Sequence, residues 1–167
     1  MQEINLYKES IFLSEFKGDL NIIDKHIEHI LLFDKGRTKT NIGGYQSKDI
    51  TFGFEELCDF MLENINKITP KKVVLENFWL NINKKGEYNK SHIHGLFGFS
   101  AVYYHKICCE NTAIQFRHLI PTIYSDKYLV NPINQSCLFF SSMLPHSVKP
   151  CSEDNHVRVS LAFNFKS

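Results

Sequence analysis

Three histidines in the sequence have the spacing of a metal site. His92 and His94 form a His-x-His pair, and a β-strand places residues i and i+2 on the same face. His146 comes much later, after the apolar run "SCLFFSSML" and Pro145, so it can supply a third imidazole from a distant strand. Three protein ligands leave coordination positions open, as a catalytic metal site requires. The sequence therefore predicts a catalytic metal centre.

Arg158 lies inside the apolar run "VRVSLAFNF" near the end of the chain. In a strand, Arg158 and Ser160 share one face, while Val157, Val159 and Leu161 share the other. A guanidinium within such a strand is costly unless it is paired. A planar guanidinium with a hydroxyl two residues later is a good receptor for a carboxylate. We expect a small acid to bind between the metal and Arg158.

The hydrophobic period predicts helices first and strands afterwards. Apolar residues recur at three- and four-residue steps over 19–33 and again over 54–68, where Pro70 ends the pattern. After Pro70, strand-like runs rich in β-branched and aromatic residues occur at 71–83, 99–107, 112–118, 128–130, 136–141 and 157–165. We predict a mostly β fold, an antiparallel barrel or jelly roll, with two N-terminal helices packed on the sheet. We expect one domain, 1–167, with helical support to about residue 70 and the barrel from about 71.

Composition limits the classes of partner and compartment. The chain has 167 residues, 43% of them hydrophobic, and a formal net charge of +1, so we expect no nucleic-acid partner. We expect no membrane association, because no apolar stretch is long enough to span a bilayer and the N-terminus has no secretory signal. Five cysteines without a Cys-x-x-Cys pair favour neither a disulfide framework nor a thiolate zinc site. We therefore expect a reducing, cytoplasmic location.

Three stretches resemble one enzyme family. They are "NFWLNINKKGEYNKSHIHGLFGFSAVYYHK" (77–106), "FFSSMLPHSVKP" (139–150) and "VRVSLAFNF" (157–165). They resemble the small 2-oxoglutarate/Fe(II)-dependent oxygenases of phage and bacterial genomes, with Asn-x-x-His-x-His, Pro-His-x-Val and Arg-x-Ser motifs. The segment "NIGGYQS" from residue 41 resembles their N-terminal motif.

The resemblance implies a double-stranded β-helix (jelly roll) and assigns roles to the residues above. It implies Fe(II) on His92, His94 and His146, and the distal carboxylate of the cosubstrate 2-oxoglutarate on Arg158 and Ser160. The implied activity uses dioxygen to hydroxylate an unknown substrate, with release of succinate and CO2. His94 matches the His-x-His motif of these small oxygenases but departs from the wider superfamily, most of which has a carboxylate at this position. A neutral ligand leaves the metal one charge more positive, to be balanced by the dianionic cosubstrate.

Other residues receive weaker assignments. Asn81 and Tyr103 alternate onto plausible cavity faces, so we predict that they reach the cosubstrate. Gly44, Tyr45 and Gln46 suit a lid with polar contacts over a substrate. The remaining histidines are expected on the surface or in the core; they are His26, His29, His105, His118 and His156.

Two other functions remain open from the residues alone. Gly86 followed by the His-x-His pair matches the start of a cupin motif, although residues 95–106 contain no carboxylate. A cupin-like metalloprotein would bind Zn, Mn or Ni without affinity for 2-oxoglutarate. A non-enzymatic jelly-roll binding module would have no need for Arg158 within its last strand.

Overall fold

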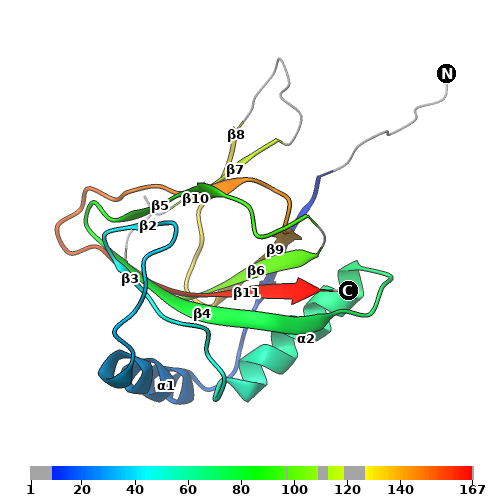
Figure 1. The fold of residues 1–167 in the computed structure, drawn as a ribbon, viewed down its shortest axis with the longest axis horizontal. Coiled ribbons are helices and arrows are strands. Elements are labelled where there is room, and N and C mark those ends of the chain that lie inside the picture. Colours follow the sequence, from blue (N-terminus) through cyan, green and yellow to red (C-terminus); the bar gives the residue numbers. More distant parts are fainter. Residues whose placement is uncertain (1–8, 97, 109–112, 119–126, 167) are drawn as a thin grey trace.

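Two antiparallel β-sheets face each other, and two helices lie outside one of them (Figure 1). The computed structural model describes residues 9–96, 98–108, 113–118 and 127–166. The elements in chain order are β1 (Ile11–Glu15), α1 (Leu20–Phe33), β2 (Asn41–Ile42), β3 (Tyr45–Gln46), α2 (Glu55–Ile68), β4 (Val74–Lys84), β5 (Tyr88–His92), β6 (Phe99–Ile107), β7 (Ile114–Arg117), β8 (Lys127–Val130), β9 (Ser136–Ser141), β10 (His146–Val148) and β11 (Val157–Lys166).

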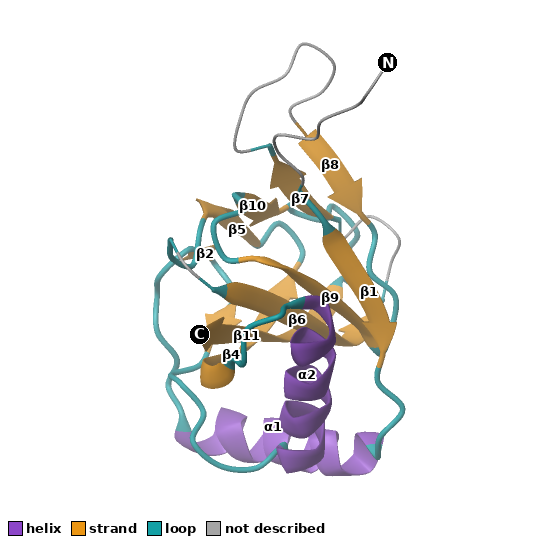
Figure 2. Ribbon diagram, turned by 90° about the vertical axis from the view of Figure 1, so that its right-hand side faces the viewer, coloured by secondary structure: helices purple, strands orange, loops and turns teal. Residues whose placement is uncertain are grey.

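The larger sheet has the strand order β1-β9-β6-β11-β4-β3, and the smaller sheet has the order β2-β5-β10-β7-β8. Figure 2 shows the two sheets stacked, with both helices on the outer side of the larger one. Strand β11 is central because it pairs with β4 along its whole length and with β6 on its other side. The fold is a mostly β jelly roll, in which two sheets enclose one interior.

A side-chain cap marks the start of α1, while α2 begins without one. Asp19 accepts a hydrogen bond from the Asn21 amide at 2.8 Å and caps the start of α1. Helix α2 follows Phe54, whose φ of 64° is left-handed, and it ends before Thr69. Each helix buries one apolar stripe, as the period of the sequence predicts. The buried residues are Ile23, Ile27 and Ile30 in α1, and Leu57, Met61 and Ile65 in α2.

The larger sheet separates two apolar clusters. The helix-side cluster contains both helical stripes together with Val159, Leu161 and Phe163 of β11. The second cluster lies between the sheets and contains Tyr104 and Phe140. Since alternate β11 residues face the helices, Arg158 and Ser160 must face the space between the sheets. The predicted division of this strand into two faces is confirmed.

The observed strands also show where the sequence prediction was incomplete. The expected strands at 99–107 and 136–141 coincide with β6 and β9, and the run at 71–83 forms the single strand β4. The first 70 residues, expected to be helical support, also supply β1, β2 and β3. Residue 112, the expected start of one strand, lies outside the described residues.

Neither helix in the described part of the chain is long and apolar enough to cross a membrane. Cys58, Cys108 and Cys137 are free thiols.

Candidate active site

The three predicted histidines meet where two neighbouring inner strands of the smaller sheet, β5 and β10, end and begin. His92 ends β5 and is the direct cross-strand partner of His146, which begins β10. His94 follows β5, and its amide donates to the Ser142 carbonyl at 2.9 Å. The three rings lie 4.4–4.9 Å apart, centre to centre. One ligand nitrogen from each side chain lies within 4.8 Å of the others, so the three can reach a single ion.

Hydrogen bonds to backbone carbonyls fix the ring tautomers of two of these histidines. His92 Nδ1 donates to the Lys90 carbonyl at 2.7 Å, and His146 Nδ1 donates to the Leu144 carbonyl at 2.9 Å. A carbonyl can only accept, so in each ring Nδ1 carries the proton and Nε2 keeps its lone pair in the neutral form. Nε2 is therefore the atom available to a metal.

The nitrogen geometry fits a transition-metal ion. His94 Nε2 and His146 Nε2 are 3.1 Å apart. Two metal–nitrogen bonds of about 2.1 Å that meet at a right angle separate their nitrogens by about 3.0 Å. Imidazole nitrogen also suits iron, nickel, copper and zinc better than calcium or magnesium. The donor set and its spacing both fit Fe(II).

Arg158 lies deeper in the same pocket as the histidines. It is 2% exposed, and its Nη2 donates to Asn83 Oδ1 at 2.7 Å. Ser160 and Asn81, directly paired across β11 and β4, also line the pocket. The pocket is narrow, with about 50 Å³ of space for water-sized molecules. The structure thus brings Asn81, Arg158 and Ser160 together with the three histidines.

Tyr103 does not line this pocket, and Tyr104 does. Tyr103 is fully buried on the helix side, with its ring 5.5 Å from that of Phe16. Tyr104 pairs with Ser160 and faces the space between the sheets. A register shift between Val159 and Ser160 changes the phase of β6, as a β-bulge does. The assignment of Tyr103 to the cosubstrate is corrected accordingly.

A family model described as "Putative 2OG-Fe(II) oxygenase" matches residues 77–164, which is more than half of the chain. The chain belongs to this 2OG-Fe(II) oxygenase family. The family assignment favours the oxygenase over the cupin-like metalloprotein and the binding module. A search of curated proteins found no match.

Solved structures with the same fold include several 2OG-Fe(II) oxygenases. HygX from Streptomyces hygroscopicus, with nickel and 2-oxoglutarate bound, aligns with a TM-score of 0.73 at 10% identity over 95% of this chain and 83% of that one. A Pseudomonas putida prolyl-4-hydroxylase aligns with a TM-score of 0.64 at 14% identity over 95% and 92% of the two chains. At such low identity these likenesses establish the jelly-roll fold of this oxygenase and nothing finer.

Burial keeps the imidazoles of this oxygenase neutral. Desolvation, with the positive charges of His92 and Lys39, lowers the pKa of His94 to about 3. Desolvation and the neighbouring histidines lower the pKa of His146 to about 3 as well. The pKa of His92 is lowered mainly by burial. A metal ion needs the unprotonated ring, so the site is ready for an ion at neutral pH.

Two buried amide side chains, those of Asn83 and Asn89, form a row of polar contacts that begins at Arg158. Asn83 is 2% exposed, and its amide lies 3.5 Å from Asn89 Oδ1. Asn89 in turn lies 3.4 Å from the hydroxyl of Thr40, which lines the pocket. Sequence reasoning missed Asn83, although Asn83 and Arg158 are direct partners across β4 and β11. Only the strand register, which no local pattern contains, reveals this contact.

The expected lid residues connect the two sheets. Gly44 lies in the turn between β2, which pairs with β5, and β3, which pairs with β4. The Tyr45 hydroxyl donates to the Asp34 carbonyl at 3.1 Å, and Gln46 is 3% exposed. None of the three lines the pocket, so their role as a lid stays a prediction.

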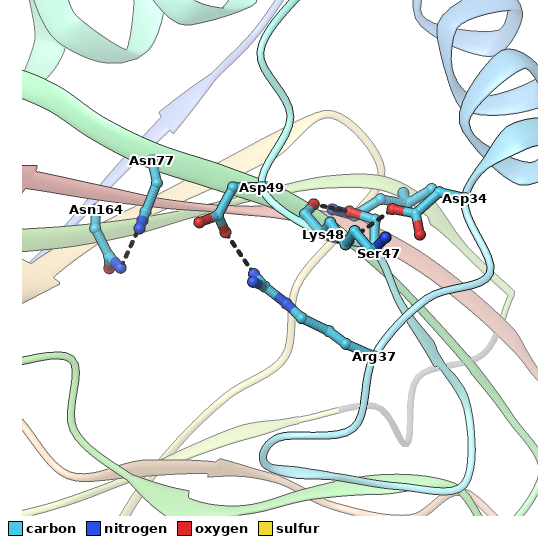
Figure 3. Close-up of polar contacts among 8 residues, drawn as sticks. Asp34, Arg37, Ser47, Lys48, Asp49, Asn77 and Asn164 are labelled. Carbon is cyan, nitrogen blue, oxygen red and sulfur yellow. Dashed lines mark hydrogen bonds and ion pairs between the residues drawn. The ribbon is translucent and has the colours of Figure 1, made fainter.

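Polar contacts also fix the chain on both sides of this turn (Figure 3). The Asp34 carboxylate accepts from the Lys48 amide at 2.7 Å. Arg37 reaches across to form an ion pair with Asp49 beside β4. These contacts anchor the segment against the larger sheet.

The remaining histidines lie outside the three-histidine cluster, as expected. His105 contacts Asp24, and His118 contacts Glu9. The rings of His26 and His29 pack on phenylalanines, and His156 Nδ1 lies 3.3 Å from the Cys108 sulfur.

Proposed function

We propose that His92, His94 and His146 hold the Fe(II) of this 2OG-Fe(II) oxygenase. The convergence of one ring nitrogen from each of the three histidines, two of whose rings are oriented through Nδ1–carbonyl hydrogen bonds, carries this assignment. The bound Fe(II), with 2-oxoglutarate and dioxygen, supplies the oxidation that hydroxylates a C–H bond of the substrate and leaves succinate and CO2.

Arg158 and Ser160 bind the distal carboxylate of 2-oxoglutarate. Both side chains are buried in the pocket that the histidines line. A guanidinium binds a carboxylate through two parallel hydrogen bonds, and a nearby hydroxyl can donate a third. Asn83 holds Nη2 and so fixes the orientation of the guanidinium plane. Asn81 and Tyr104 contribute polar groups to the wall between the two ends of the cosubstrate.

Aromatic rings pack against two of the three histidines. The Phe140 ring centre is 4.8 Å from that of His146, and the Trp79 ring centre is 5.5 Å from that of His94. Apolar walls of this kind strengthen the electrostatic contacts of a bound anion and limit side reactions with water. The chain thus binds, orients and desolvates, while the cofactor carries the chemistry.

The same proposal covers the organisation and setting of the protein. Residues 1–167 act as a single domain in which α1 and α2 support the outer face of the larger sheet, as their shared buried cluster suggests. The free thiols among the described cysteines suit a reducing, cytoplasmic compartment. The reaction partners are dioxygen and a substrate that neither the fold nor the family identifies.

Succinate formation tests the activity directly. The protein, reconstituted with Fe(II) without oxygen and then exposed to air, is expected to convert 2-oxoglutarate to succinate even without substrate. No succinate above that formed by a protein lacking His146 (His146→Ala) would contradict the proposal.

Thermal unfolding tests the carboxylate receptor. At one hundred times its Kd, a ligand stabilises the folded state by about 2.7 kcal/mol, which raises Tm by about 5–10 °C for a domain of this size. Arg158→Leu is expected to abolish the rise in Tm that 2-oxoglutarate causes, while Arg117→Leu, at an exposed position, should retain this rise. Ser160→Ala should reduce the rise in part. Equal stabilisation of native protein and Arg158→Leu would remove Arg158 from the site.

A further inference from the structure

None of the three proposed metal ligands carries a negative charge. Its three ligands are imidazoles, which are neutral when they bind a metal. The lining of the pocket, as far as the structure describes the chain, contains no aspartate or glutamate. A divalent ion there would therefore keep both of its positive charges.

Other positive charges surround the same space. Arg158 adds a buried guanidinium to the wall of the pocket. Thr40 lines the pocket and follows Lys39 in the chain, and the Lys39 charge is close enough to His94 to lower its pKa. Low-dielectric surroundings make such like-charge repulsion more costly than it is in water. A divalent ion alone is thus poorly accommodated, and an anion is required.

We propose that metal and 2-oxoglutarate bind to this protein as a mutually dependent pair, because the diacid supplies the negative charge that the ligand set lacks. The inference rests on the proposed function and adds a regulatory property to it: the site holds its metal tightly only when the cosubstrate is present. Coupling is reciprocal, so the metal must tighten 2-oxoglutarate binding by the same factor. His94, in the position where a carboxylate would otherwise lower the charge, is the residue that sets this dependence.

The fluorescence of Trp79 can report metal binding directly, in the absence of turnover. It is the only tryptophan in the chain, and its ring centre is 5.5 Å from that of His94. Co(II) quenches tryptophan fluorescence at such short range, so titration in anaerobic buffer gives a metal Kd. The quantity of interest is the ratio of the Co(II) Kd without 2-oxoglutarate to the Kd with saturating 2-oxoglutarate.

Two variants separate the effect of negative charge at position 94 from the effect of side-chain shape. His94→Asp introduces a carboxylate ligand, whereas His94→Asn has nearly the same shape as aspartate and no charge. We expect the ratio for the native protein to exceed that for His94→Asp by at least tenfold. His94→Asn should bind Co(II) only when 2-oxoglutarate is present. A ratio in the native protein within twofold of that in His94→Asp would overturn the inference.

A second measurement needs no variant, in case substitution impairs folding. Azide is a small monoanion that can occupy a coordination position, so it should tighten Co(II) binding to the native protein. An unchanged Co(II) Kd in azide would also overturn the inference.

The proposed function and the proposed coupling would be rejected by different results. Absence of 2-oxoglutarate binding in the presence of metal rejects the proposed function, while equally tight metal binding with and without 2-oxoglutarate rejects the coupling alone.

Discussion

Replacing Asn83 with aspartate is expected to stabilise the fold while weakening cosubstrate binding. Asn83 Oδ1 accepts from Arg158 Nη2 at 2.7 Å, and both side chains are 2% exposed. Asn83→Asp puts a carboxylate at this contact, so a charged pair replaces a charge–amide hydrogen bond. The folded state should be at least as stable as the native one, because the new anion pairs with an existing buried cation.

The Asn83→Asp substitution should weaken binding of the 2-oxoglutarate carboxylate that we propose Arg158 to hold. Two anions on opposite edges of one guanidinium lie about 6 Å apart and repel by roughly 2.8 kcal/mol at an effective dielectric constant of about 20. At about 1.4 kcal/mol for each factor of ten, the Kd for 2-oxoglutarate should rise by about 100-fold. Isothermal titration calorimetry on metal-loaded protein measures this change, and urea unfolding measures stability.

Asn83→Ala serves as the matched control. It removes a hydrogen bond to a buried charged group, which costs roughly 1.5–3 kcal/mol of stability, but it adds no competing anion. Its effect on the Kd for 2-oxoglutarate should therefore be the smaller of the two. If Asn83→Asp binds 2-oxoglutarate with native affinity, the guanidinium of Arg158 is not the receptor for the distal carboxylate.

Three further predictions concern the pocket and the loop beside it. Tyr104→Phe should weaken 2-oxoglutarate binding by roughly 10-fold or more in calorimetry, since a hydrogen bond to a charged group is worth about 1.5–3 kcal/mol. Tyr103→Phe should change the same Kd by less than about threefold. Equal effects would refute the placement of Tyr104 on the pocket side of β6 and of Tyr103 on the helix side. In metal-free protein, the folded-state pKa values of His94 and His146, about 3, lie below the unfolded value of about 6.5. The unfolded chain therefore binds more protons, so urea unfolding should show at least about 2 kcal/mol less stability at pH 5 than at pH 7, and a flat profile would argue against buried neutral rings. Gly98→Ala should lower stability by about 1–3 kcal/mol, because φ is +142° and the added Cβ would clash with the Phe165 carbonyl oxygen. An unchanged Tm would contradict this prediction.

The parts of the fold that depend on local pattern were accessible from the sequence. The apolar periods over 19–33 and 54–68 agree with α1 and α2 within a residue at each end, and the long β-rich runs agree with β6 and β9. The short strands β2, β3 and β10 have two or three residues each. They exist because distant partners supply their hydrogen bonds, so their own composition carries no signal.

In the candidate site, too, local sequence motifs were predictable, whereas features that depend on strand register were not. The His-x-His pair, His146 and the Arg-x-Ser pair are local motifs, and the structure brings all five residues to one pocket. The choice between Tyr103 and Tyr104 depends on a register shift in β6, and a shift by one residue exchanges the two faces of a strand. Neighbouring tyrosines are chemically identical, so no reading of residue types could have chosen between them.

The turn at Gly44 has a consequence for the carbon-chain length of the cosubstrate. The strands on its two sides bind β5, which carries His92, and β4, which runs beside Arg158. The turn is tight, since a side chain at Gly44 would approach the Ile82 carbonyl oxygen to 2.8 Å. This link joins the sheet that carries His92 to the sheet that carries Arg158, and in the proposed binding mode the spacing of the two sheets sets the distance between the two ends of a bound 2-oxo acid. Oxaloacetate, one carbon shorter, and 2-oxoadipate, one carbon longer, would each satisfy one end of the pocket at the expense of the other.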